Sequence, residues 1–222
     1  MTRDIKGITI LLISLFLMQS CHNSHTPEGK TICVIGDSYV RNHRRPIEET
    51  WHYKVADRLD MNYHNFGRNG ACIAFNRDKE GFGPSLLERY RQIPDSTDYI
   101  LIIAGHNDAY KIAERPELFE LLCQRLDSLC MGLRTYYPQA RIGFVTPWDV
   151  PRPGFKEVNT LIHEVCSKYE IPVYDAARHS GIHVADTAFR KQYFQGLKDQ
   201  AHLNDAGHNL LVDKGEAFIR SL

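Results

Sequence analysis

The sequence lacks an excess of charge of either sign. Lys and Arg together number 27, as do Asp and Glu, so the formal net charge at pH 7 is zero. It also lacks a Lys- and Arg-rich run of the kind that marks a phosphate-binding patch. These two absences argue against nucleic acid as a partner. A hydrophobic fraction of 43% is ordinary for a folded domain and argues against intrinsic disorder.

Metal-binding and disulfide patterns are absent as well. The cysteines after Cys21 are odd in number and form no C-x-x-C pair, so they predict neither a disulfide framework nor a zinc site. Cys123 and Cys130 fall in one expected helix, about 10 Å apart along its axis, which is too far for a disulfide. The histidines lack a spacing such as H-E-x-x-H. We therefore expect buried free thiols and neither a metal nor an organic cofactor.

The longest apolar run lies at the N-terminus. Arg3 and Lys6 precede residues 8–18, and Ser20 follows them. That run is shorter than the roughly 20 residues a membrane-spanning helix needs. A charged start, a short apolar run and a small residue near a cleavage point are typical of an export signal. We expect residues 1–20 to be a signal peptide.

The residues around Cys21 refine this expectation. Leu-Met-Gln-Ser ahead of Cys21 resembles the lipobox of bacterial lipoproteins, although Met18 and Gln19 depart from the commonest Leu-Ala-Gly-Cys form. The resemblance implies that Cys21 is lipidated and holds the exported protein at a bacterial membrane, facing the periplasm or the cell surface. Residues 21–30 would form a tether and residues 31–222 a single domain. An ordinary cleaved signal peptide is the alternative.

The rest of the chain alternates strand-like and helix-like segments. Tyr99–Ala104 is apolar on both faces, as a central parallel strand should be. Further strands are predicted at Thr31–Gly36, Asn62–Phe66, Arg141–Thr146 and Ile171–Tyr174. Helices are predicted from Pro46, over Pro84–Ile93, from Pro116, over Phe155–Tyr169 and from near Asn204, while Ala176–Lys198 is poorly patterned. Strands separated by helices predict an α/β fold, a three-layer α/β/α sandwich around a five-stranded parallel sheet.

Polar segments follow the predicted strands, where a parallel sheet carries its functional site. These segments are Gly36-Asp37-Ser38-Tyr39, Asn65 to Gly70, Gly105-His106-Asn107-Asp108, and Asp199-Gln200-Ala201-His202 before the last helix. A nucleophilic hydroxyl needs a base, a group that orients the base, and donors for the oxyanion that develops. The four segments supply all of these groups. We expect Asp37 to brace its turn and Asp108 to be structural.

In this order the segments resemble the motif blocks of the SGNH (GDSL-like) hydrolase superfamily, and the resemblance extends from Ile35 to His208. It implies a flavodoxin-like five-stranded sandwich and hydrolysis of esters through an acyl-enzyme, with no metal or organic cofactor. It also implies the site roles: Ser38 as nucleophile and oxyanion donor, Gly70 and Asn107 as further oxyanion donors, His202 as general base and acid, and Asp199 as the acid that orients it.

Two functions besides ester hydrolysis are compatible with these residues. An O-acyltransferase would use the same groups and pass the acyl group to a sugar hydroxyl. A surface glycan-binding module on an inactive hydrolase scaffold is the other alternative, although the complete set of site residues argues against it. The expected substrate is a small-molecule or glycan ester, such as an acetylated carbohydrate. The sequence leaves the acyl chain, the alcohol and the oligomeric state open.

Three further assignments have competing interpretations. Asp205 and His208 repeat the Asp-x-x-His spacing, but His208 would lie in the first turn of the last helix, whose dipole disfavours an imidazolium. We therefore expect His202 to be the base. The run Arg41–Arg45 is interpreted as a solvated face in preference to a grip for an acidic sugar. Trp148 is expected either as a sugar-stacking wall or as a partly buried aromatic at the rim of the site.

Overall fold

The structure is a computed structural model that describes residues 26–222, so the expected signal peptide and Cys21 lie outside the described residues. Its sheet consists of β1 (Thr31–Gly36), β2 (Asn62–Gly67), β3 (Tyr99–Ile103), β4 (Arg141–Val145) and β5 (Val173–Tyr174). The strand order is β2-β1-β3-β4-β5, and each neighbouring pair is parallel. The predicted five-stranded parallel sheet is confirmed.

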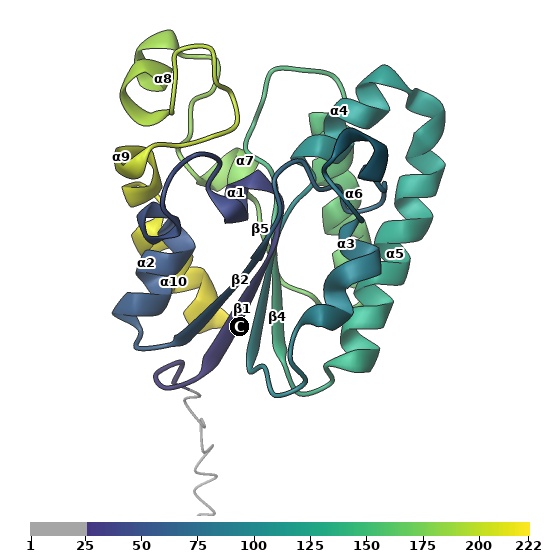
Figure 1. The fold of residues 1–222 in the computed structure, drawn as a ribbon, viewed down its shortest axis with the longest axis vertical. Coiled ribbons are helices and arrows are strands. Elements are labelled where there is room, and N and C mark those ends of the chain that lie inside the picture. Colours follow the sequence, from purple (N-terminus) through teal and green to yellow (C-terminus); the bar gives the residue numbers. More distant parts are fainter. Residues whose placement is uncertain (1–25) are drawn as a thin grey trace, which may run out of the picture.

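Helices cover both faces of the sheet (Figure 1). One layer contains α2 (Trp51–Arg58) and α10 (Val212–Ser221), and the other contains α3 (Leu86–Arg89), α4 (His106–Glu114), α5 (Phe119–Tyr136) and α6 (Phe155–Lys168). Short helices lie near the carboxyl ends of the strands: α1 (Ser38–Arg41), α7 (Ala176–His179), α8 (Thr187–Tyr193) and α9 (Asp205–Asn209). The three-layer α/β/α sandwich is therefore confirmed.

The core forms on both sides of the central strands. Every residue of β3 is buried, because the strand lies between β1 and β4 and is covered by helices above and below. On one face α5 contributes a leucine stripe at helical spacing, in which Leu122, Leu126, Leu129 and Leu133 are buried. Burial of continuous apolar strands between two helical layers is what stabilises a parallel sheet of this type.

The predicted helix from Pro46 is interrupted. Ile47–Glu49 forms a 3-10 turn, and Thr50 then adopts an extended conformation (φ −70°, ψ 144°) and caps α2 by accepting a hydrogen bond from the Tyr53 N–H. Threonine favours this capping position over the helix interior, because its hydroxyl can satisfy a free N–H of the first turn. The apolar spacing continues across the break, which is why the sequence suggests one helix.

Other segments also differ in detail. The poorly patterned stretch contains α7 and α8, which begin at aspartate caps: Asp175 accepts from the Arg178 N–H and Asp186 from the Ala188 N–H. Helices this short carry too little periodicity to be recognised. Asn204 caps the C-terminal region, accepting from the Gly207 N–H at 2.9 Å. That region is divided into α9 and α10 instead of forming one helix.

The chain enters β1 at the amino end of the sheet. Pro27 is buried, and the Gly29 N–H donates to the carbonyl oxygen of Asp60 at 2.8 Å. The last residues of the expected tether therefore pack against the domain. Between residues 26 and 222, no helix combines the length and apolar character needed to cross a membrane.

Gly67 allows α1 to lie directly against the end of β2. A β-carbon at this position would be 2.4 Å from the Arg41 backbone nitrogen and 2.7 Å from the Val40 carbonyl carbon. Because both are backbone atoms, neither can move without displacing α1. We expect Gly67→Ala to lower the free energy of unfolding by about 1–3 kcal/mol in urea titrations. The matched control is Gly196→Ala, whose β-carbon has no neighbour within 4 Å; equal losses in the two variants would contradict this account of the packing.

Candidate active site

Ser38 is the first residue of α1, immediately after β1. The preceding Asp37 is fully buried, and its Oδ1 accepts a hydrogen bond from the Tyr39 N–H at 2.8 Å. Asp37 therefore braces the turn, in agreement with the sequence-based expectation. Ser38 itself is only 7% exposed, so little of this residue reaches the surface at the carboxyl end of the sheet.

Ser38, His202 and Asp199 form one chain of hydrogen bonds. The Nε2 atom of His202 is 2.9 Å from Ser38 Oγ, and its Nδ1 atom is 2.9 Å from Asp199 Oδ2. The other carboxylate oxygen accepts from the N–H groups of Ala201 at 2.8 Å and His202 at 2.9 Å. With Nδ1–H directed at the carboxylate, Nε2 carries the lone pair that can accept the serine proton.

Asp199 is ionised in this arrangement. Burial opposes its ionisation, but hydrogen bonds from the His202 side chain and from the loop backbone outweigh burial, so the pKa of Asp199 lies below its usual value. An ionised acid fixes the ring orientation of the histidine and stabilises the imidazolium that forms when the base takes up a proton. The arrangement can thus activate a hydroxyl for attack on an electrophile.

The second Asp-x-x-His match lies elsewhere. Asp205 is paired with Lys54, and Nδ1 of His208 accepts from the Trp51 N–H at 3.4 Å. His208 is 3% exposed, and burial holds its pKa well below the usual value. His208 therefore connects α9 to α2, and it is His202 that contacts Ser38.

The resemblance implies two backbone N–H donors for the oxyanion. Neither the Ser38 N–H nor the Gly70 N–H donates a hydrogen bond to any of residues 26–222. Gly70 adopts a left-handed conformation (φ 73°), and its carbonyl oxygen accepts from Nη1 of Arg77 at 2.8 Å. Free backbone donors occur at the start of a helix, as at Ser38, and in partly exposed turns, as at Gly70. Two of them beside a candidate nucleophile can serve an anionic oxygen.

The Asn107 side chain lies on the first turn of α4. Its Nδ2 atom donates to the Ala71 carbonyl oxygen at 2.9 Å, which fixes the amide. The second contact of Nδ2, to Asp37 Oδ2, is 3.5 Å long. That distance exceeds the usual range of about 2.7–3.2 Å, so this N–H can turn to a better acceptor.

Asp108 holds the loop that follows Gly70. Its two carboxylate oxygens accept from the N–H groups of Ile73 at 2.8 Å and Ala74 at 3.1 Å. Burial raises the pKa of Asp108 to about 6 and that of Asp37 to about 7. The structural role expected for Asp108 is consistent with these contacts.

Arg89 was not singled out by the sequence. It is 5% exposed and donates to the carbonyl oxygens of Gly36, at 2.6 Å, and Phe66. Gly36 is the last residue of β1 and Phe66 the last but one of β2, so one buried guanidinium links the two strand ends that precede Ser38 and Gly70. Only the spatial pairing of β1 with β2 reveals this role, since nothing in the sequence around Arg89 indicates it.

Tyr39, His106 and Trp148 form an aromatic cluster beside the nucleophile. The Tyr39 hydroxyl is 2.8 Å from Nδ1 of His106, and its ring stacks on Trp148 with centroids 3.8 Å apart. Trp148 is 2% exposed, so the expectation of a sugar-stacking wall or a partly buried rim residue is wrong: stacking on Tyr39 places the indole in the core. Burial lowers the pKa of His106 to about 3, which keeps its ring neutral.

The run Arg41–Arg45 divides into residues with different surroundings. The ring of His43 stacks on that of His202, with centroids 4.5 Å apart. Arg45 forms an ion pair with Glu49, whereas Arg44 is exposed. Part of the run thus borders the candidate site.

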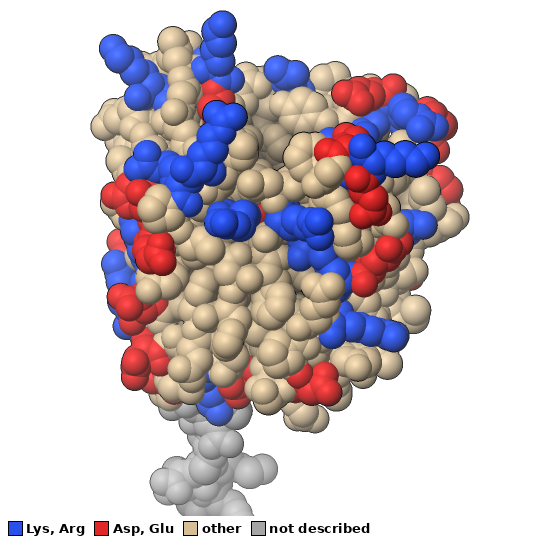
Figure 2. Space-filling view, in the orientation of Figure 1, with Lys and Arg blue, Asp and Glu red and all other residues tan. Residues whose placement is uncertain are grey.

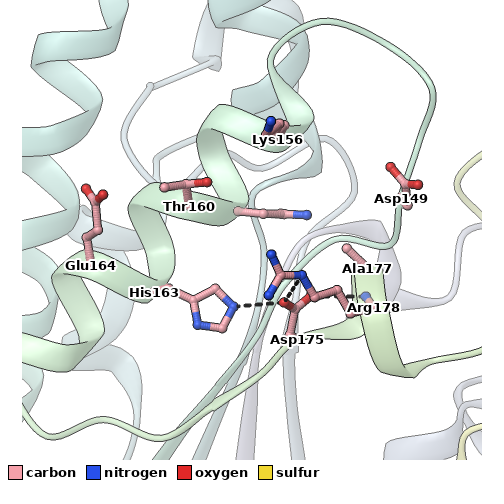
Figure 3. A pocket seen from close by; sticks show the side chains of 9 residues that line it. Asp149, Lys156, Thr160, His163, Glu164, Asp175, Ala177 and Arg178 are labelled. Carbon is pink, nitrogen blue, oxygen red and sulfur yellow. Dashed lines mark hydrogen bonds and ion pairs between the residues drawn. The ribbon is translucent and has the colours of Figure 1, made fainter.

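A hollow of about 470 Å³ opens beside α6 and α7, at the β5 edge of the sheet. Figure 3 shows His163 and Arg178 directed at Asp175 there, at 3.3 Å and 3.5 Å. It contains no serine or cysteine among its lining residues. The cysteines of the described part are free, and Cys123 is the one that is not fully buried. No group of three or more His, Cys, Asp or Glu residues within 26–222 is arranged to hold a metal ion.

Known proteins share both the sequence pattern and the fold. The profile of the GDSL-like lipase/acylhydrolase family matches residues 34–210, whereas no curated protein matches the chain. A structure from Lactobacillus plantarum is 22% identical, with a TM-score of 0.74 and coverage of 87% of this chain and 98% of that chain. The psychrotrophic esterase EstA from Pseudoalteromonas sp. is 17% identical, with a TM-score of 0.65 and coverage of 86% and 97%. The acetyl xylan esterase AlAXEase is 16% identical, with a TM-score of 0.64 and coverage of 85% and 99%.

His52 provides a test of the electrostatics behind the Ser38 turn. It is fully buried, with Nε2 3.4 Å from the Tyr39 carbonyl oxygen, and burial lowers its pKa to about 3. An unfolded-chain histidine titrates near about 6.5. At a pH between these two pKa values, His52 is protonated in the unfolded chain and neutral in the native protein. Acidification therefore favours unfolding by up to about 1.4 kcal/mol per pH unit.

We therefore expect the stability advantage of the wild type over His52→Gln to shrink as the pH falls from about 6.5 to about 4. The measurement is the free energy of unfolding in urea at several pH values. Taking the difference between the two proteins cancels the other titrating groups. An advantage that does not change with pH would show that His52 is not held neutral in the native state.

Proposed function

The chain belongs to the GDSL-like lipase/acylhydrolase family, and we propose that it hydrolyses carboxylic esters through an acyl-enzyme on Ser38. The observation that carries this proposal is the pair of 2.9 Å hydrogen bonds that join Ser38 Oγ to His202 and His202 to Asp199. The family contains ester-cleaving lipases and acylhydrolases, and these three residues supply the nucleophile, base and acid that such a reaction needs.

In the first half of the reaction, Nε2 of His202 removes the proton of Ser38 Oγ as this oxygen attacks the ester carbonyl carbon. The carbonyl π-bond opens, and its electron pair moves to the oxygen, which becomes an oxyanion. Asp199 keeps the imidazolium in place through Nδ1–H. When the tetrahedral intermediate collapses, the bond to the alcohol oxygen breaks and the imidazolium gives its proton to the leaving alcohol.

The oxyanion needs donors that are in place before the charge appears. The N–H groups of Ser38 and Gly70, which have no acceptor within residues 26–222, support this role. The second side-chain N–H of Asn107 also supports this role. Its 3.5 Å contact with Asp37 Oδ2 is long, so this N–H can give it up for a hydrogen bond to the oxyanion. Loss of one such donor typically lowers turnover by about 10²–10³.

In the second half, water takes the place of the alcohol. His202 removes a proton from the water as its oxygen attacks the acyl carbon. Collapse of the new tetrahedral intermediate breaks the bond to Ser38 Oγ, which regains its proton from the imidazolium, and a free carboxylic acid leaves. None of these steps requires a metal or an organic cofactor.

The acyl group that fits beside Gly70 is small. The ring of Phe82 lies so close to Gly70 that a β-carbon there would be 2.3 Å from its Cδ1 atom. Tyr39, which follows Ser38 in the chain, is buried and stacks on the buried Trp148. We propose acetyl or similarly short esters of carbohydrates as substrates, a choice that the acetyl xylan esterase among the structural relatives supports.

The base assignment is tested by two histidine variants. We expect His202→Ala to lower kcat for 4-nitrophenyl acetate by several orders of magnitude, because both proton transfers pass through this ring. His208→Ala should have a modest effect, since His208 contacts the backbone of α2. Activity is compared at equal concentrations of folded protein, with Ser38→Ala as the inactive reference and release of free acid as the sign of transfer to water. An inactive His208→Ala beside an active His202→Ala would move the base to the second pair.

Export and lipidation at Cys21 are a separate proposal. The site lies at the carboxyl end of β1, and the chain reaches the amino end of that strand at Thr31. Six residues of strand separate the two ends by about 20 Å. A lipid anchor at Cys21 would therefore hold the protein with its site directed away from the membrane, toward substrates in the surrounding medium.

Phase partitioning tests the anchor. The wild-type protein expressed in a bacterium that processes lipoproteins should enter the detergent phase, and Cys21→Ala should enter the aqueous phase or remain unprocessed. Cys123→Ala, which changes a cysteine inside the domain, is the control and should partition like the wild type. Aqueous partitioning of the wild type would replace the lipoprotein assignment by an ordinary signal peptide.

A further inference from the structure

The proposed reaction determines where the alcohol part of the substrate lies. The imidazolium of His202 must protonate the leaving oxygen, so that oxygen comes within hydrogen-bonding distance of Nε2. Residues that flank the His202 ring on its accessible side therefore border the alcohol. One residue that flanks the ring is His43, whose own ring stacks on that of His202 with centroids 4.5 Å apart and planes inclined by 25°. The loop that carries His43 is thus part of the alcohol site.

This loop is held in an unusual conformation. Asn42 and Arg44 both have positive φ angles, 56° and 64°, which are rare for residues other than glycine. Asn42 is 2% exposed; its Nδ2 donates to the Pro46 carbonyl oxygen, and its Oδ1 accepts from Nε2 of Gln195 at 3.4 Å. Strained backbone persists where surrounding contacts maintain it, and it is frequent in binding loops. Here it directs Arg44 toward the surface beside His43.

A hollow of about 370 Å³ opens next to this loop. Such a volume falls within the range of about 300–1,000 Å³ found for small-molecule sites. The hollow is lined by His43, Arg44, Arg45, Gln195, Gly196 and Asp199. It therefore extends from the basic loop to the acid of the site.

The charged side chains around this hollow differ in their partners. Arg45 is neutralised by Glu49, and the carboxylate of Asp199 is occupied by His202 and the loop backbone. Arg44 forms no ion pair or side-chain hydrogen bond with any of residues 26–222. One guanidinium charge is thus left without a partner at the edge of the alcohol site.

A second guanidinium borders the site from the opposite loop. Nε of Arg152 donates to Oε1 of Gln200 at 3.1 Å, and its guanidinium lies 5.3 Å from the ring centre of Tyr110. Its partners are neutral, so its charge is also uncompensated. Figure 2 shows Lys and Arg side chains in a row across this face, at the height where Figure 1 places α1. Arg44 and Arg152 are thus two guanidinium groups near the Asp199–His202 loop that have no carboxylate partner within residues 26–222.

We propose that the alcohol part of the substrate is an acidic sugar, whose carboxylate is bound by Arg44. This inference rests on the proposed ester hydrolysis and adds the chemical class of the alcohol. A guanidinium can bind a carboxylate through two parallel hydrogen bonds, which specifies orientation as well as charge. Arg44 thereby acts as a specificity-determining residue, and it takes no part in the proton transfers.

The test compares two substrates that differ in one group. A monoacetylated methyl galacturonide carries a carboxylate at C6, and the matching methyl galactoside carries a hydroxymethyl group there. We expect kcat/KM to be about 10- to 100-fold higher for the acidic ester, because a charge-assisted pair of hydrogen bonds to the carboxylate stabilises the bound substrate by a factor of that size. The preference should weaken as salt is added, because Arg44 is exposed and screening is effective at the surface.

Three variants assign the preference to Arg44. Arg44→Met removes the charge and keeps most of the apolar stem. Arg44→Gly also removes it and suits the positive φ at this position, so loss of folding is not expected. Both should hydrolyse the two sugar esters at similar rates, each rate being expressed relative to hydrolysis of 4-nitrophenyl acetate by the same variant. Arg141→Met, at the amino end of β4 and thus at the opposite end of the sheet, should keep the preference.

The outcomes separate this inference from the function on which it rests. Equal rates for the two sugar esters in the wild type, or a preference that survives in both Arg44 variants, would overturn the inference while 4-nitrophenyl acetate is still hydrolysed. If the wild type hydrolyses none of the three esters, it is the proposed function that fails.

Discussion

The hydrogen bond between Ser38 Oγ and Nε2 of His202 joins residues that are 164 positions apart, and the rest of the molecule is arranged so that it can form. A parallel sheet brings the carboxyl ends of all its strands to one edge, so Ser38, Gly70 and Asn107 approach one another although each follows a different strand. His202 comes from the loop before α9, which is held by the Asn204 cap. The Asp199 carboxylate then binds both the ring and the backbone of this loop.

Electrostatics distinguishes Asp199 from the other buried acids. Burial raises the pKa of Asp37 to about 7 and that of Asp108 to about 6, whereas hydrogen bonds to His202 and its loop outweigh burial at Asp199 and lower its pKa. The buried histidines 52 and 106 are kept neutral, with pKa values lowered by burial to about 3. Different surroundings thus leave one ionised carboxylate beside the candidate base, a separation that acid–base catalysis uses widely.

The sequence predicts the parts of this arrangement that depend on local pattern. The continuous apolar run of β3 and the polar segments after the strands are visible in the residues themselves, and together they lead to the sheet and to Ser38, His202 and Asp199. Contacts between distant segments are not visible in this way. The stacking of Trp148 on Tyr39 and the bonds from Arg89 to Gly36 and Phe66 arise only once the strands are paired. The break at Thr50 is of another kind, because a hydroxyl cap competes there with an uninterrupted apolar stripe.

The most direct test of the account is covalent labelling by a fluorophosphonate, whose phosphorus is attacked by an activated serine with loss of fluoride. Mass spectrometry of the digested protein should find one phosphonyl group, on the peptide that contains Ser38. Labelling should be lost in Ser38→Ala and greatly slowed in His202→Ala. A folded wild-type protein that takes up no label, or takes it up at another residue, would contradict the claim that Ser38, His202 and Asp199 form a working catalytic unit.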